Sequence, residues 1–189
     1  MSKRDLILET TLVLVNEIGL LGTTVSQISK RANISPGIIY HYFSTKEEII
    51  HTLYKVVEEE FVKEATRNNP VDLPILECYQ EIWTRVFSYC VENPEKMTYI
   101  EAYQNSAYFK DCISTARNEL LETLSKKNEA SITAGELKDL PIEAIYAMTG
   151  RVALELAKLH IRGVNPLRSH SVEEMAESVC RSILAWEVT

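Results

Sequence analysis

Apolar residues near the N-terminus recur at helical spacing in short runs, and polar residues that favour helix ends separate these runs. The first run ends at Gly19 and comprises Leu6, Ile7, Thr10, Leu14 and Ile18. The second consists of Val25, Ile28 and Ala32, and in the third Ile39 and Phe43 lie four residues apart. Each run gives one apolar face, so the pattern predicts three amphipathic helices that can share a small core.

Two of these helices are preceded by residues that cap helix N-termini. Thr24 and Gln27 have the spacing of a capping box, in which each side chain bonds to the other residue's backbone N–H. Ser35 followed by Pro36 places an N-cap before a proline at the first helical position. Asn33 stands at the turn between the two helices, and asparagine tolerates a left-handed backbone.

A third capping signal starts a longer helix. It is either Ser44 with Glu47 or Thr45 with Glu48, and the sequence leaves both pairings open. Three helix starts in so short a span predict a helix-turn-helix over about residues 24–43, the arrangement of many DNA-binding proteins.

The outward face of the third helix is unusual for a solvated surface. With Ile39 facing the core, Gly37 and His41 point away from it, and Ile38 and Tyr40 flank them. A glycine permits close approach, an isoleucine can contact a thymine methyl group, and hydroxyl groups can bond to phosphates. Tyrosines can also brace a small domain, and histidine is a common surface residue. The clustering of these residues on one face favours DNA binding.

The rest of the chain also shows helical periodicity and no alternation typical of strands. A long helix is expected from Lys46 to about residue 68, and Lys46 in its first turn can bind a phosphate beside the helix N-terminus. Further helices are expected over about residues 74–91, from Pro94 onward, over 107–127 and 141–162, and after Ser171, which fits a capping box with Glu174. Residues 128–140 are expected to form a loop.

Eight of the fifteen Phe, Trp and Tyr residues lie between Tyr79 and Phe109. Core packing is the simpler interpretation of such stripes. Tyrosine and tryptophan have polar tips that need partners, however, so the cluster also suits an amphipathic cavity. The candidate cavity-lining residues are Trp83, Phe87, Tyr99 and Tyr103.

Charge is distributed unevenly along the chain. The net charge is −7, but residues 1–55 contain six Lys or Arg against five Asp or Glu, and the remainder contains fourteen against twenty-two. The acidity therefore belongs to the C-terminal part, which would keep that part away from DNA. A nearly neutral DNA-binding part must rely on a few placed contacts and on dimerisation.

The four cysteines lie far apart, at positions 78, 90, 112 and 180, without the spacing of a metal site. Reduced, mostly buried thiols are expected, with redox sensing as an alternative. The sequence shows no signal peptide and no apolar run of membrane-spanning length, so a soluble cytoplasmic protein is expected. No cofactor, metal or catalytic residue is predicted.

The segment from Gly22 to Ile49 resembles the DNA-binding domain of TetR-family transcriptional regulators. The Ser-x-Gly-x-x-Tyr opening from Ser35 and the Tyr-x-Tyr-Phe-x-x-Lys ending at Lys46 occur together, and the resemblance extends over about residues 3–61. It departs from the family pattern at Ala32-Asn33-Ile34, where Ala-Gly-Val is usual. It also departs at position 26, where the family often has a basic or polar residue and this chain has only a serine.

The resemblance implies a role for each residue of the motif. Pro36, Gly37, Ile38 and His41 would face base edges. Phosphates would be held by Thr24, Tyr40, Tyr42 and Lys46, and the N-cap Ser35 completes the predicted DNA-binding set. The predicted fold class is therefore all-α, with an N-terminal three-helix helix-turn-helix domain over residues 1–61 and a larger helical effector-binding and dimerisation domain over residues 62–189.

The last two helices have features of an oligomer interface. Small residues recur at Ala147, Gly150, Ala153 and Ala157, and the final apolar stripe comprises Val172, Met175, Val179, Ile183 and Trp186. Both features could also serve an intramolecular core. The resemblance implies a two-fold dimer through a four-helix bundle made from these helices, and pairing would set the half-site spacing of a palindromic operator.

The functional hypothesis is a homodimeric repressor that a small-molecule effector releases from double-stranded operator DNA. The sequence does not distinguish a repressor from an activator. It also does not identify the effector, the operator or the regulated genes. One alternative is a DNA-bound regulator controlled by a protein partner. Another is an all-helical enzyme, although the sequence shows no nucleophile–base pair or phosphate-binding loop.

Overall fold

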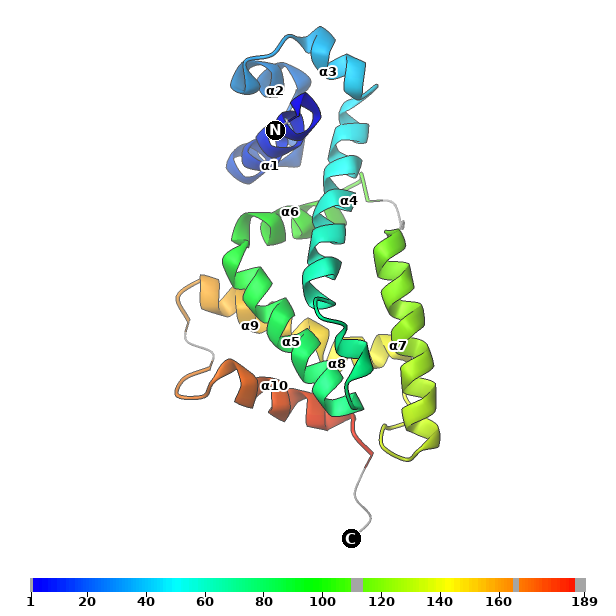
Figure 1. Ribbon diagram of the computed structural model, residues 1–189. Helices are drawn as coiled ribbons and strands as arrows, with labels where there is room; N and C mark the ends of the chain where they lie inside the picture. Colours follow the sequence, from blue (N-terminus) through cyan, green and yellow to red (C-terminus); the bar gives the residue numbers. More distant parts are fainter. Residues whose placement is uncertain (1, 110–113, 165–166, 186–189) are drawn as a thin grey trace. The chain divides into compact units, whose positions relative to one another are not determined.

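The computed structural model describes residues 2–109, 114–164 and 167–185, which form only helices and their connections (Figure 1). In chain order the helices are α1 (Lys3–Gly22), α2 (Val25–Ala32), α3 (Pro36–Tyr42), α4 (Lys46–Ala65), the 3-10 helix η1 (Pro70–Asp72), α5 (Ile75–Glu92), α6 (Pro94–Gln104), α7 (Thr115–Thr133), α8 (Ile142–Met148), α9 (Gly150–Ile161), α10 (Val172–Cys180) and the 3-10 helix η2 (Arg181–Ile183). This confirms the predicted all-α fold class. In the described ranges, no helix combines the length and apolar character needed to span a membrane.

The chain separates into two compact units, and neither is contiguous in sequence. The first unit comprises Met1–Glu59 and Asn93–Cys112, and the second comprises Glu60–Glu92 and Ile113–Thr189. The sequence led us to expect a contiguous first domain ending at residue 61, whereas packing adds α6 to the first unit. Helix α4 begins in the first unit and ends in the second.

The predicted capping chemistry sets the ends of α2 and α3. Thr24 Oγ1 accepts the Gln27 backbone N–H at 3.3 Å, and Gln27 Oε1 accepts the Thr24 N–H at 2.8 Å. Asn33, at the C-cap of α2, has φ 54° and ψ 44°, the left-handed conformation expected at the turn. Ser35 Oγ then accepts the Ile38 N–H at 3.4 Å. The turn between α2 and α3 is thus specified locally.

The start of α4 resolves the pairing that the sequence left open. Thr45 Oγ1 accepts the Glu48 N–H at 3.1 Å, so Thr45 is the N-cap. The Glu48 carboxylate reaches one residue further back and accepts the Ser44 N–H at 2.6 Å. Two backbone donors at the helix start are thereby satisfied, and the carboxylate lies at the positive end of the helix dipole.

The core of the first unit contains the apolar faces that the sequence predicted. Ile7, Ile28, Ile39 and Ile49 come from four different helices and are each 0% exposed. At Gly19 the backbone leaves helical geometry, with φ 75°, and the assigned helix continues to Gly22. The helix end that the sequence predicted at Gly19 is therefore a break in the helical geometry within α1.

Two buried tyrosines attach α6 to α4 within the first unit. The Tyr99 hydroxyl donates to the Ile50 carbonyl at 2.5 Å. The Tyr103 hydroxyl lies 2.8 Å from His51 Nδ1, and its ring stacks on Tyr54 with centroids 4.3 Å apart. Tyr99 and Tyr103 are each 0% exposed, so their polar tips find partners inside this unit.

In the second unit, α5 packs against α9 and α10. Ala153 and Ala157 on α9 are both fully buried, and their small side chains allow close approach of neighbouring helices. For these two residues the intramolecular alternative is correct, and they are unavailable to a dimer interface. Ile183 is also buried, whereas Trp186 lies outside the described residues.

Two predictions of secondary structure in the second unit were wrong. Helix α7 continues to Thr133, so residues 128–133 are not part of a loop. Asn128 is buried and accepts a hydrogen bond from the Tyr79 hydroxyl at 2.9 Å, which explains a polar residue inside a packed helix. The helix predicted over residues 141–162 is interrupted at Thr149, which has φ −115° and ψ −76°.

The Tyr99 hydrogen bond should stabilise the first unit measurably. We expect Tyr99→Phe to lower the free energy of unfolding by about 1 kcal/mol, because a buried hydroxyl–carbonyl bond is lost. Urea unfolding followed by circular dichroism measures this. Tyr108→Phe is the matched control, since Tyr108 is only partly buried, and its effect should stay within about 0.5 kcal/mol. Equal stability of Tyr99→Phe and the unmodified protein would contradict the assignment.

Candidate DNA-binding surface and ligand cavity

Helix α3 buries one side and exposes the residues that the sequence singled out. Ile39 is 0% exposed and Phe43, at the C-cap, is 2% exposed. On the other side, Tyr40 and Tyr42 are 56% and 40% exposed. We call the set Pro36, Gly37, Ile38, Tyr40, His41 and Tyr42 the reader face; within it Pro36, Gly37 and His41 are also exposed and Ile38 is half-buried.

Gly37 is not required by packing within the chain. A Cβ atom built at this position would have a single neighbour within 4 Å, Ser35 Oγ at 3.9 Å. Its backbone is helical, so no special conformation requires glycine there either. A glycine at this position would, however, allow close approach of an external partner, such as the floor of a DNA groove.

Thr24 and Ser35 lie at the starts of α2 and α3, where both side chains are exposed. Their hydroxyl oxygens accept the backbone hydrogen bonds that cap the helices. Structural capping thus accounts for both residues, and phosphate binding by either one stays a prediction.

Lys46 has partners within the first unit. Its Nζ donates to the Leu20 carbonyl at 2.8 Å and lies 5.5 Å from the centre of the Tyr108 ring. The side chain is half-buried, and its charge satisfies a carbonyl close to the end of α1. Lys46 thereby links α1 to α4, and its predicted phosphate contact would require this side chain to exchange partners or to act through its backbone.

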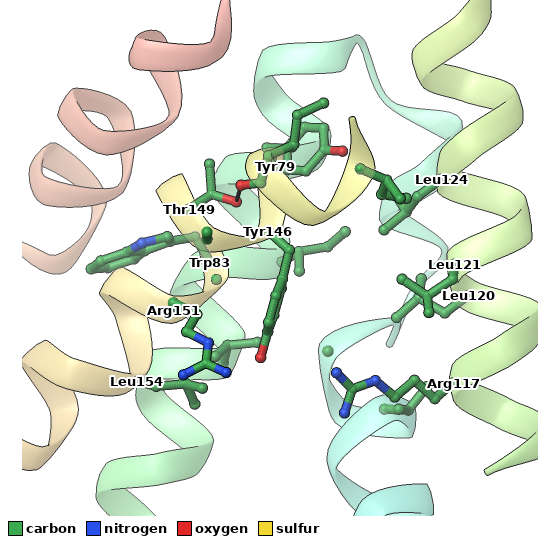
Figure 2. Close-up of a pocket in the computed structure, with 18 of the residues that line it drawn as sticks. Tyr79, Trp83, Arg117, Leu120, Leu121, Leu124, Tyr146, Thr149, Arg151 and Leu154 are labelled. Carbon is green, nitrogen blue, oxygen red and sulfur yellow. Dashed lines mark hydrogen bonds between the residues drawn. The ribbon is translucent and has the colours of Figure 1, made fainter. Parts of the chain in front are cut away.

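The second unit contains a cavity of about 550 Å³ between α4, α5, α7, α8 and α9. This volume is typical of small-molecule sites. Its walls are mainly apolar, and Figure 2 shows leucines of α7 facing aromatic residues of α5 and α8. Representative apolar lining residues are Phe61, Val62, Ile82, Leu121, Leu124 and Ile145.

The cavity includes one of the four aromatic residues that the sequence nominated. Trp83 lines it and is 1% exposed. Phe87 lies behind, with its ring stacked on Trp83 at a centroid distance of 5.6 Å. Tyr99 and Tyr103 do not line this cavity, because α6 packs in the first unit and both hydroxyls bond to α4. Helical spacing alone could not show which unit α6 joins.

The sequence did not identify several polar residues that line the cavity, including two arginines and a tyrosine. Arg117 on α7, Tyr146 on α8 and Arg151 on α9 approach one end of the cavity (Figure 2). The Arg117 guanidinium carbon lies 5.8 Å from the centre of the Tyr146 ring. A signal was present, since Arg117 precedes Leu120, Leu121 and Leu124 at spacings of three, four and seven. An arginine in an apolar helical stripe can mark a charged group beside a cavity.

The described cysteines are unsuited to redox chemistry. Cys78, Cys90 and Cys180 are buried, and burial raises the pKa of Cys78 to about 11 and the pKa values of Cys90 and Cys180 to about 12. Thiolate is the reactive form, so these groups stay inert near neutral pH. Among the described residues, no group of His, Cys, Asp and Glu has the arrangement of a metal site.

Alkylation should test the buried thiols. At about pH 8, we expect iodoacetamide to modify Cys78, Cys90 and Cys180 much more slowly in the folded protein than in denaturant, because raised pKa values keep the thiols protonated. Reactivity should rise only as the pH approaches these values. Peptide mass spectrometry measures each site separately. Equal rates in folded and denatured protein would contradict the assigned burial.

Two family models match separate parts of the chain. One, described as "Bacterial regulatory proteins, tetR family", matches residues 7–53. The other, "Tetracyclin repressor-like, C-terminal domain", matches residues 74–184. An uncharacterized HTH-type transcriptional regulator of Haemophilus influenzae is 24% identical over 139 residues, covering 74% of this chain and 73% of that protein.

Solved structures show the same fold. A TetR family transcription regulator from Marinobacter aquaeolei has a TM-score of 0.82 at 20% identity, covering 97% of this chain and 96% of its own. The transcriptional regulator FadR from Bacillus subtilis, in complex with stearoyl-CoA, has a TM-score of 0.69 at 19% identity, with 95% and 96% covered. Since the second family model alone matches more than half of the chain, the protein belongs to the TetR family and is a DNA-binding transcriptional regulator.

Proposed function

We propose that the protein is a dimeric repressor whose affinity for a palindromic operator falls when a small-molecule effector occupies the cavity of the second unit. The reader face would contact DNA, and the cavity would bind the effector. Coupling between them requires that the effector bind more tightly to the conformation with low operator affinity.

One observation carries this proposal: α4 begins in the unit that contains the reader face and ends in the wall of the cavity. Its first residue, Lys46, bonds to the end of α1 in the unit that contains the reader face. Its last turns supply Phe61, Val62 and Ala65 to the cavity wall. A ligand that displaces these wall residues acts on the same helix that holds α1 and α6, which gives the coupling a physical route.

A protein of similar fold supports the proposal of a small-molecule effector. FadR of Bacillus subtilis, which shares the fold, was solved in complex with stearoyl-CoA. A regulator controlled only by a protein partner does not require an internal cavity, so the cavity favours the effector-responsive alternative. The enzyme alternative gains no support from the relatives described above, which are named as transcription regulators.

The proposed dimer interface uses the apolar side chains that remain partly exposed on α10. Ala176 and Cys180 are buried within the chain. Val172, Met175 and Val179 are half-buried and lie on a neighbouring stripe of the same helix. Two such helices, paired about a two-fold axis, would bury this stripe and present two reader faces to two half-sites. Of the other predicted interface residues, Ala147 and Gly150 line the cavity.

Effector response can be tested with an operator recovered by selection from random-sequence DNA. In fluorescence anisotropy, at least one compound from a chemically broad set should weaken operator binding by about tenfold or more. Leu121→Trp should abolish the response by filling the cavity, while operator binding persists. Val164→Trp, at an exposed position outside the cavity, is the control. Unchanged operator affinity across the whole set would favour the protein-partner alternative.

Gly37→Ala should separate folding from DNA binding. The added methyl group meets no close neighbour in the chain, so thermal stability should be kept or slightly increased. Operator affinity should fall by about tenfold if DNA approaches this surface closely, equivalent to about 1.4 kcal/mol. Gly22→Ala, whose methyl group would make an ordinary 3.5 Å contact with Ile18, is the matched control. Full operator affinity of Gly37→Ala would remove Gly37 from the interface.

A further inference from the structure

We propose that the cavity of the second unit binds an anionic amphiphile, with the anionic head beside Arg117 and Arg151 and an alkyl body along the apolar walls. This inference names the ligand class for the cavity to which the proposed function assigns the effector, and in that respect it rests on that function.

Polarity changes along the cavity. Trp83, Tyr79 and Ile145 are 1%, 5% and 1% exposed and form its buried wall. Arg117 is half-buried and Arg151 is exposed, so the charged residues lie towards solvent. In Figure 2, Tyr79 and the two arginines lie at opposite ends of the labelled group, and Trp83 lies between Tyr79 and Arg151. A ligand with an apolar body and a polar head matches this gradient, because its head keeps access to water.

The two guanidinium groups converge from different helices. Figure 2 shows Arg117 reaching from α7 and Arg151 from α9, with the Tyr146 side chain between them. Arg117 packs with its guanidinium carbon 5.8 Å from the Tyr146 ring centre. Planar guanidinium groups bind carboxylate and phosphate oxygens with two parallel hydrogen bonds, so the pair can hold one anionic head.

Both arginines lie in the first turn of their helices. Arg117 is the third residue of α7 and Arg151 the second residue of α9. Within these two fully described helices, neither first turn contains an acidic residue. A cation at a helix N-terminus is unfavourable, since the helix dipole is positive there. An anion bound to either guanidinium group would offset this unfavourable interaction at that helix start.

The start of α9 also lacks a side-chain cap. The Thr149 hydroxyl, at the N-cap position, donates to the Ile145 carbonyl at 2.7 Å and makes no capping bond. Thr149 is also the C-cap of α8, so the start of α9 adjoins the end of that helix. Among the described lining residues, two arginines and one carboxylate, Glu143, carry charge beside the apolar walls.

Tryptophan fluorescence offers a direct test of ligand class. The chain has two tryptophans, so Trp186→Phe leaves Trp83 in the cavity wall as the reporter. The probes are decanoate, decyl phosphate, decanol and decylammonium, which share an alkyl chain and differ in head group. We expect decanoate or decyl phosphate to bind at least about tenfold more tightly than decanol, with decylammonium weakest. The relative affinities of the two anions distinguish a carboxylate from a phosphate head.

Arginine variants test whether the head lies where we place it. Arg117→Gln and Arg151→Gln, singly and together in the Trp186→Phe background, should reduce the preference for the anion by about tenfold while decanol binding changes little. Arg162→Gln is the matched control, because Arg162 is exposed at the end of α9 and does not line the cavity. Circular dichroism verifies folding of each variant.

The possible outcomes separate the two proposals. Equal affinity for decanoate and decanol, tighter binding of decylammonium, or no binding of any probe would overturn the anionic-amphiphile assignment. An anion preference that persists in the double arginine variant would overturn the placement of the head. Arginine-dependent binding of decanoate without any change in operator affinity would support the ligand class and would instead count against the proposed effector response.

Discussion

The continuity of α4 is the constraint on which the functional interpretation depends. This helix is capped by Thr45 and Glu48, holds the buried tyrosines of α6 at its middle, and ends in the cavity wall. Each backbone carbonyl in an α-helix is bonded four residues on, so a sharp kink within α4 would break hydrogen bonds. A displacement of its last turns is therefore resisted by the hydrogen bonds that join them to the preceding turns.

The DNA-binding part was predictable because its signals are local. The Thr24 box, the left-handed Asn33 and the Ser35 cap each depend on residues within four positions, and all three appear in the structure. The reader face followed from the predicted burial of Ile39 and Phe43, since a helix that buries one side must expose the other. Which exposed side chains bind DNA is a property of the complex and stays a prediction.

The cavity was less predictable because it depends on how distant helices pack. Trp83 and Tyr103 share the aromatic character that suggested a pocket, yet the hydroxyl of Tyr103 bonds to His51 in the first unit. Sequence spacing reports a face of one helix and does not report the helix that covers it. The arginine in the apolar stripe of α7 was a better clue, because a charge among leucines is costly unless a solvent-accessible or polar site lies beside it.

The membership of α6 in the first unit has a consequence for the exchange of parts among related regulators. A chimera that takes only residues 1–61 from this protein would leave α4 without Tyr99 and Tyr103, and apolar surface at its middle would meet the α6 of another protein. The DNA-reading module is therefore encoded by two separated stretches of the chain. Mutations in α6 that accompany changes in operator preference would have a structural origin even though α6 contains none of the reader face.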